Sequence, residues 1–121
     1  MLTRPNRLTK ERQYKDVYRL GRSARAPLAT CVAATVAEPT LVGIVASRRV
    51  GGAVERNRAK RRLRHAARTL WPELPESGWH IVLIATPATG TVDYGRLLDE
   101  LRRLLRELGV VGTGCSPPTD T

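Results

Sequence analysis

Residues 47 to 68, SRRVGGAVERNRAKRRLRHAAR, hold the side chains of this sequence that are best suited to bind phosphate. Nine of them are Arg or Lys and only Glu55 is acidic, so the segment carries 9 − 1 = +8 of the chain's formal charge of +10. Guanidinium groups form paired hydrogen bonds with phosphate and stack on bases, which suits RNA. The segment therefore predicts a polyanionic partner. Its cations are Arg48, Arg49, Arg56, Arg58, Lys60, Arg61, Arg62, Arg64 and Arg68.

The charges of this segment should destabilise it as an isolated helix. Cations in a first helical turn oppose the helix dipole, at a cost of roughly 0.3–1 kcal/mol each. Like charges also meet at i, i+4, for example at Lys60 and Arg64. Gly51, Gly52 and Ala53 provide no side-chain cap, which leaves backbone N–H groups free near several arginines. We therefore expect an anion site at the start of this helix, where a phosphate would relieve both problems.

A helical wheel drawn over residues 53 to 70 separates two faces. Small and apolar side chains gather on one side, which should pack on a sheet. The opposite side should present a row of cations on a rigid support. The apolar side holds Ala59, Leu63, Ala66, Ala67 and Leu70; the outward side holds Asn57, Arg58, Arg61, Arg64, His65 and Arg68, with Lys60 and Arg62 at its flanks.

The remaining sequence predicts the elements that position this helix. Residues 9 to 20 read as a first helix, capped by Thr9 and closed by Gly21 in a left-handed conformation. Residues 22 to 27 read as a polar connector. Tyr14, Val17 and Tyr18 give the first helix one apolar, aromatic face, and the two tyrosines either pack in the core or present an edge to a ligand.

Three apolar runs predict strands. Residues 28–36 and 41–47 flank Glu-Pro-Thr and are expected to form an antiparallel hairpin. Residues 79–86 form a continuous apolar run typical of a central strand. Residues 93–109 predict a last helix, capped by Asp93 and ended by Gly109, with a leucine stripe.

The order α-β-β-α-β-α predicts the α+β class, with one small sheet and helices packed on it. We expect a single RNA-binding domain over 1–111, with a basic arm at 1–8 and a disordered tail at 112–121. The N-terminus lacks a signal peptide and no run is long enough to span a bilayer, so a cytoplasmic location without a membrane partner is expected.

Chemistry by the protein itself is not expected. The carboxylates are scattered at turns and element ends, and His65 and His80 lie apart, so neither a catalytic residue nor a metal site is predicted. Cys31 is expected in the core and Cys115 in the tail. The arginines cover too broad an arc to read one DNA groove, and no helix-turn-helix is predicted, so DNA is not an expected partner.

The motif from Arg48 to Arg61 resembles the signature of the protein subunit of bacterial ribonuclease P. In that family a basic pair, a Val/Ile-Gly step and an Arg-Asn-Arg core lead into a basic helix. Here these are Arg48-Arg49, Val50-Gly51 and Arg56-Asn57-Arg58, followed by Lys60-Arg61. The likeness extends over roughly residues 6 to 108, including NRLTKERQYKDVYRLG and IVLIATPA.

The resemblance implies a fold, partners and roles. The fold would be a small mixed sheet with a left-handed β-α-β crossover, whereas general chirality rules favour a right-handed one. The catalyst would be the ribonuclease P RNA, which uses Mg²⁺ to remove the 5′ leader of precursor tRNA. The leader would contact Tyr14 and Tyr18 in a cleft between the first helix and the sheet. The catalytic RNA would contact Arg48, Arg49, Arg56, Asn57, Arg58, Lys60, Arg61, Arg62, Arg64 and Arg68.

Two features depart from the family. The chain has no Phe, so tyrosines replace the usual phenylalanines of the first helix, and the first long strand offers no aromatic side chain to the cleft. Stacking should survive with a thinner platform. A structural ribosomal or ribosome-assembly protein is the alternative hypothesis, because it follows the same charge logic.

Overall fold

A computed structural model describes residues 11–110. It confirms the α+β class and places the three predicted helices within a few residues of their expected bounds. The capping role of Thr9, the basic arm 1–8 and the tail 112–121 lie outside the described residues. The elements are α1 (Glu11–Leu20), β1 (Arg22–Arg25), β2 (Ala29–Pro39), β3 (Leu41–Val45), α2 (Ala53–Leu70), β4 (Ser77–Ala85) and α3 (Tyr94–Glu107), with short 3-10 turns at Arg48–Val50 and Trp71–Glu73.

The four strands form one mixed sheet in the order β1-β2-β4-β3. β4 is central, as expected, and it pairs antiparallel with β2 and parallel with β3. The predicted hairpin of β2 and β3 is therefore wrong, because β4 lies between them. A continuous apolar strand is most stable where both its edges and both its faces are covered. The place between β2 and β3 gives β4 such cover. The parallel β3-α2-β4 unit is present, and its hand stays a prediction.

The predicted connector at 22–27 is also wrong, because Arg22–Arg25 forms strand β1, antiparallel to β2. Its sequence, Arg-Ser-Ala-Arg, has one apolar residue, Ala24, which is the only one of the four that is buried. So polar a strand is stable at the edge of a sheet, where one face and one edge meet water.

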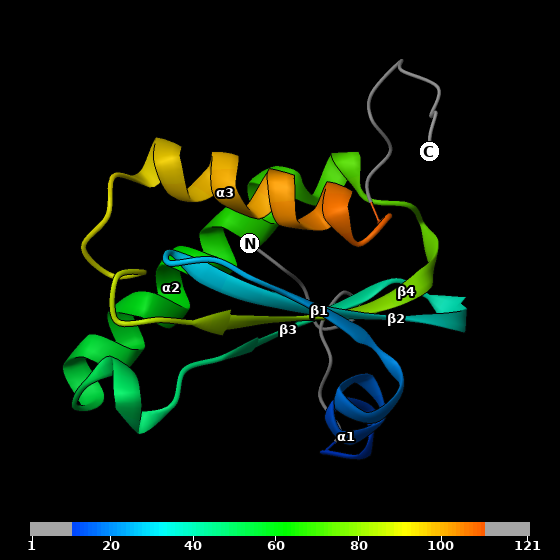
Figure 1. Ribbon diagram of the computed structural model, residues 1–121, viewed down its shortest axis with the longest axis horizontal. Coiled ribbons are helices and arrows are strands. Elements are labelled where there is room, and N and C mark those ends of the chain that lie inside the picture. The colour runs from blue at the N-terminus through cyan, green and yellow to red at the C-terminus, as the bar shows by residue number, and fades with distance from the viewer. Residues whose placement is uncertain (1–10, 111–121) are drawn as a thin grey trace.

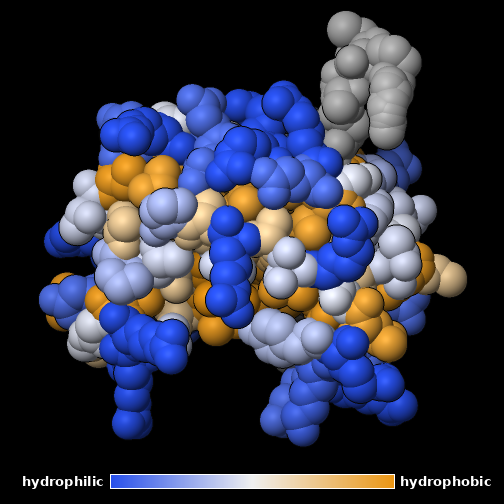
Figure 2. All heavy atoms as spheres, in the orientation of Figure 1, coloured by the Kyte–Doolittle hydropathy of each residue, from blue (hydrophilic) through white to orange (hydrophobic). Residues whose placement is uncertain are grey.

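The sheet separates two cores, which Figure 1 shows as layers: α2 and α3 cover one face and α1 covers the other. The larger core includes Leu63 of α2 and Leu101 of α3, both fully buried, and Cys31, which confirms its expected core position. The smaller core joins Val17 of α1 to Val32 and Val82. In Figure 2, hydrophilic side chains spread over α3 and project from the opposite side of the molecule.

Gly21 ends α1 differently from the prediction. Its N–H donates to the carbonyl of Val17 at 2.8 Å, but its φ is not positive. A Cβ at this position would lie 2.7 Å from the carbonyl oxygen of Ala33. Glycine is needed here because the chain passes close to β2, and a left-handed turn plays no part. At the other end of the fold, the predictions for α3 are confirmed: Asp93 accepts from the N–H of Arg96 at 3.3 Å, and Gly109 has a φ of 82°.

Candidate nucleic-acid interface

The structure confirms the two faces predicted for α2. Ala59, Leu63 and Ala66 are fully buried against the sheet and α3, and Ala67 and Leu70 are nearly so. The opposite face points to solvent: Asn57, Arg58, Arg61, His65 and Arg68 are exposed, and Arg56, Lys60 and Arg62 are half-buried along the flanks. Arg64, predicted on the outward side, is half-buried as well, and its Nε is buried.

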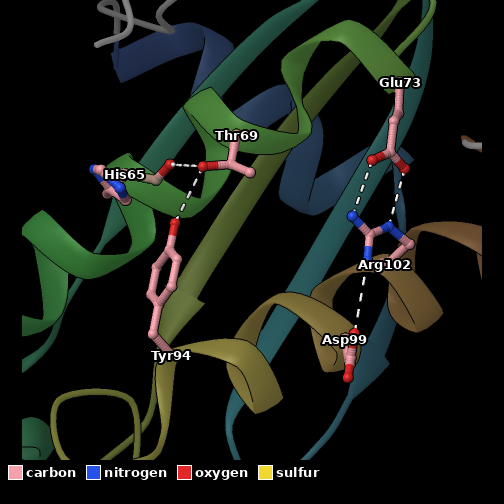
Figure 3. Close-up of polar contacts among 6 residues, drawn as sticks. All are labelled: His65, Thr69, Glu73, Tyr94, Asp99 and Arg102. Atoms are coloured by element: carbon pink, nitrogen blue, oxygen red, sulfur yellow. Dashed lines mark hydrogen bonds and ion pairs between the residues drawn. The ribbon is translucent and has the colours of Figure 1, made fainter.

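None of the nine cations of segment 47–68 forms an ion pair with a carboxylate of residues 11–110. The ion pairs of the described chain lie elsewhere. On α3, Arg102 donates two hydrogen bonds of 3.0 Å to Glu73 and lies 3.6 Å from Asp99 (Figure 3). The hydrogen bond from Arg102 lowers the pKa of Glu73. Arg103 pairs in the same way with Glu100 and Glu107. Among the described residues, the cations of α2 thus have no ion-pair partner, whereas Arg102 and Arg103 of α3 are neutralised.

Two hollows lie side by side along the outward face of α2. The larger, about 510 Å³, is lined by Val54, Asn57, Lys60, Arg61 and Arg64. The smaller, about 220 Å³, is lined by Arg61, Arg64, His65 and Arg68. The buried Nε of Arg64 has no hydrogen-bond partner among the described residues. Both hollows thus offer donors and positive charge to a ligand.

The start of α2 is less open than the sequence predicts. Glu55 folds back, and its Oε1 accepts the N–H of Gly52 at 3.0 Å. The carboxylate of the segment therefore occupies part of the expected anion site. The N–H groups of the first helical turn itself have no acceptor within the helix. Arg48 and Arg49 stand exposed in the 3-10 turn just before it.

The second predicted surface lies on the face of the sheet that α1 covers. Tyr14 is half-buried because its ring lies over Gly43 of β3, where a Cβ would come within 2.6 Å of the ring. Tyr18 is 47% exposed. Partial burial, and then the neighbouring Tyr14, raise the pKa of Tyr18. The two tyrosines therefore differ: Tyr14 braces α1 on the sheet, and Tyr18 leaves about half of its surface open to solvent.

The same face of the sheet also carries a hollow of about 440 Å³, whose lining residues lie outside α1. Ile84 packs with the α1-side core, and its cross-strand partner is Thr30, which in turn pairs with Arg25. Directly paired residues share a face, so Arg25 lies on this one. Arg49 also lines the hollow. Sequence reasoning missed Arg25 because β1 was taken for a connector, and a single apolar residue in Arg-Ser-Ala-Arg gives no alternation that would have predicted a strand.

The loop between β4 and α3 joins this groove to α2, and the sequence did not reveal it. Thr89 is fully buried, and its Oγ1 donates to the carbonyl of Leu28 at 2.6 Å and accepts the N–H of Thr86 at 2.8 Å. The Thr89 carbonyl accepts a hydrogen bond from Arg62 at 3.2 Å. The next residue, Gly90, lies close to the side chain of Arg58. The loop therefore fixes Arg62 of α2 relative to the turn before β2 and lies beside the side chain of Arg58.

No cluster of three or more His, Cys, Asp or Glu side chains within residues 11–110 could hold a metal ion. His80 is buried on β4, with its Nε2 3.2 Å from Glu38 Oε1, and His65 lies far along the chain on α2. Among the helices of the described residues, none is long and apolar enough to cross a membrane.

A cationic helix that forms no ion pair within residues 11–110 lies beside an arginine-flanked groove on a small mixed sheet. These features define a class: α+β proteins whose surface is suited to a polyanion. Comparison with known proteins narrows that class. The family model described as Ribonuclease P matches residues 2–109. The chain belongs to this family.

Two relatives and one solved structure from the same family are similar to this chain. A ribonuclease P protein component from a Picosynechococcus species is 42% identical over 106 residues, covering 86% of this chain and 90% of the relative. That from Ruegeria pomeroyi is 52% identical over 73 residues, covering 60% of this chain and 58% of the relative, so this match spans little more than half of that protein. The ribonuclease P protein of Staphylococcus aureus superposes with a TM-score of 0.75 at 20% identity, covering 88% of this chain and 98% of the other, which shows the shared fold.

Proposed function

We propose that this chain is the protein subunit of ribonuclease P. It binds the catalytic RNA and the 5′ leader of precursor tRNA, and it assists the endonucleolytic removal of that leader. The observation that carries the proposal is segment 47–68, which includes most of α2: none of its nine cations is paired with a carboxylate of the described chain. The family match favours this function over the ribosomal alternative.

The outward face of α2 is the proposed docking surface for the catalytic RNA. Its exposed guanidiniums can pair with phosphates without first breaking an internal ion pair, so association releases counterions at little cost to the protein. Arg62 is held in place by its hydrogen bond to the carbonyl of Thr89, and Arg58 passes close to Gly90. Glu55 would leave Gly52 when a phosphate arrives at the helix start.

The groove on the α1 side of the sheet is the proposed site of the single-stranded leader. The exposed part of Tyr18 offers a stacking surface, and Arg25 and Arg49 flank the hollow farther along the sheet. Stacking does not depend strongly on base identity, which suits leaders of varied sequence. Arg49 is expected to contact the catalytic RNA, but it also lines this hollow. It therefore lies between the proposed leader site and the proposed RNA-docking face of α2.

Hydrolysis is assigned to the RNA, and the described residues contain no carboxylate cluster that would bind Mg²⁺. In this proposal the metal ions are held by RNA phosphates. The protein contributes positive charge and orientation: it screens the repulsion between two RNAs and holds the leader beside the catalytic RNA. The screening contributed by the protein matters most when Mg²⁺ is scarce, because divalent ions at higher concentration screen the same repulsion.

Reconstitution tests the proposal directly. The protein is mixed with a bacterial ribonuclease P RNA at low Mg²⁺, and leader removal from precursor tRNA is followed on gels. We expect strong stimulation over RNA alone by the wild-type protein and little by a variant with Arg58→Glu and Arg61→Glu. No stimulation by the folded wild-type protein would overturn the proposal.

A further inference from the structure

The far end of α2 carries an aromatic group that the roles above do not use. His65 is exposed, and its ring packs against Tyr94 at the start of α3, with centroids 5.2 Å apart and an interplanar angle of 60°. Figure 3 shows Thr69 between the backbone carbonyl of His65 and the hydroxyl of Tyr94. Its Oγ1 donates to the His65 carbonyl at 3.0 Å and lies 3.2 Å from the Tyr94 hydroxyl. The imidazole is thus backed by a second ring that is itself hydrogen-bonded.

Cations stand on both sides of this ring. Arg61 and Arg68 lie one helical turn before and after His65, so the three side chains share one strip of α2. With Arg64 they line the hollow of about 220 Å³. An aromatic surface between two guanidiniums is the combination with which proteins hold single-stranded nucleotides: the base stacks and the phosphates on each side pair with the cations.

We propose that Arg61, His65 and Arg68, backed by Tyr94, bind one unpaired nucleotide of RNA, with its base stacked on the imidazole. The inference rests on the proposed function for its RNA partner. A paired helix could engage the two arginines but would leave the imidazole unused, because its bases are already stacked on each other. The site therefore selects a bulged, looped or terminal nucleotide.

Proton NMR of the full chain tests the stacking. The chain has two histidines, and His80 is only 4% exposed, so the His65→Phe spectrum identifies the His65 signals by their loss. A short single-stranded oligoadenylate should shift the His65 ring protons upfield through the ring current of the base. Inorganic polyphosphate at matched phosphate concentration supplies the same charge without bases. An equal shift with polyphosphate, or none with bound oligoadenylate, would overturn the site.

Assembly experiments then identify the source of the nucleotide. Binding of the protein to ribonuclease P RNA is one arm, and binding of precursor tRNA to the assembled holoenzyme is the other. His65→Ala should weaken the arm that supplies the nucleotide by at least about fivefold, and His65→Phe should restore it because it retains a stacking ring. A purely electrostatic contact would instead be retained by His65→Lys and lost in His65→Phe, which would refute the proposal.

The two proposals fail separately. If His65→Ala stimulates leader removal and binds both RNAs like the wild type, the nucleotide site is wrong and the subunit assignment stands. If the wild-type protein shows the oligoadenylate shift but does not stimulate a ribonuclease P RNA, the site stands and the assignment is wrong.

Discussion

The salt dependence of RNA binding measures how many phosphates α2 contacts. Arg58 and Arg61 are both exposed and neither is paired with a carboxylate of the described chain, so we choose the double change Arg58→Gln and Arg61→Gln. Each lost phosphate contact should reduce the slope of log K against log salt by about 0.7–0.9. Two contacts therefore give about 1.4–1.8, and the affinity gap between wild type and variant should shrink about tenfold between 50 and 200 mM salt.

Fluorescence anisotropy of labelled ribonuclease P RNA, titrated over a KCl series at constant Mg²⁺, provides the measurement. The matched control is Arg103→Gln, which removes one charge from a guanidinium already paired with Glu100 and Glu107. Its slope should stay within about 0.3 of the wild type. Parallel lines for the wild type and the double variant would refute the reasoning, as would an equal slope change for the control.

Three further changes test other parts of the account. Tyr18→Ala should lower affinity for precursor tRNA by about 1–3 kcal/mol per stacked base, measured as a Kd against leaderless tRNA. Thr89→Val leaves the carbonyl of Leu28 without its donor and should cost about 1–3 kcal/mol of unfolding free energy, measured by urea titration. Glu55→Gln should tighten RNA binding in the same anisotropy assay, because it removes a negative charge yet can still accept the N–H of Gly52.

A control variant or a contrary result is defined for each of these changes. Tyr18→Phe should bind like the wild type, and an equal loss for leaderless tRNA in Tyr18→Ala would indicate a folding defect. Thr89→Ser should restore most of the stability, since it keeps the hydroxyl. For Glu55→Gln, weaker RNA binding at unchanged stability would show that the carboxylate serves the interface.

The sequence was most informative about which side of each helix is buried, because that depends on the helical period alone. The buried side of α2, from Ala59 to Leu70, follows from the 3.6-residue period alone, and so does the leucine stripe of α3. Strand pairing was beyond such reasoning. The turn after Pro39 looks local, but β3 takes its partner from β4, about 40 residues away, because long-range burial outweighs the turn.

The candidate site, too, was predictable in its local features and unpredictable in its tertiary contacts. Which cations point outward could be predicted from the period, but which of them are held could not. Arg62 binds a carbonyl of the loop at Thr89, and Arg25 reaches the groove only because β1 joins the sheet edge. Glu55 at the N–H of Gly52 was likewise hidden, since a glycine cap reads as an open helix end. These contacts depend on tertiary placement.

The central claim is that the outward face of α2, and not α3, docks on the catalytic RNA. A photo-cross-linker attached through Asn57→Cys on α2, or through Asp99→Cys on α3, tests it in a Cys115→Ser background. Cys31 is fully buried, and burial raises its pKa to about 12, so it should not be labelled. Irradiation of the holoenzyme should join ribonuclease P RNA to position 57 and leave position 99 unlinked. Equal cross-linking from both positions, or none from position 57, would contradict the account.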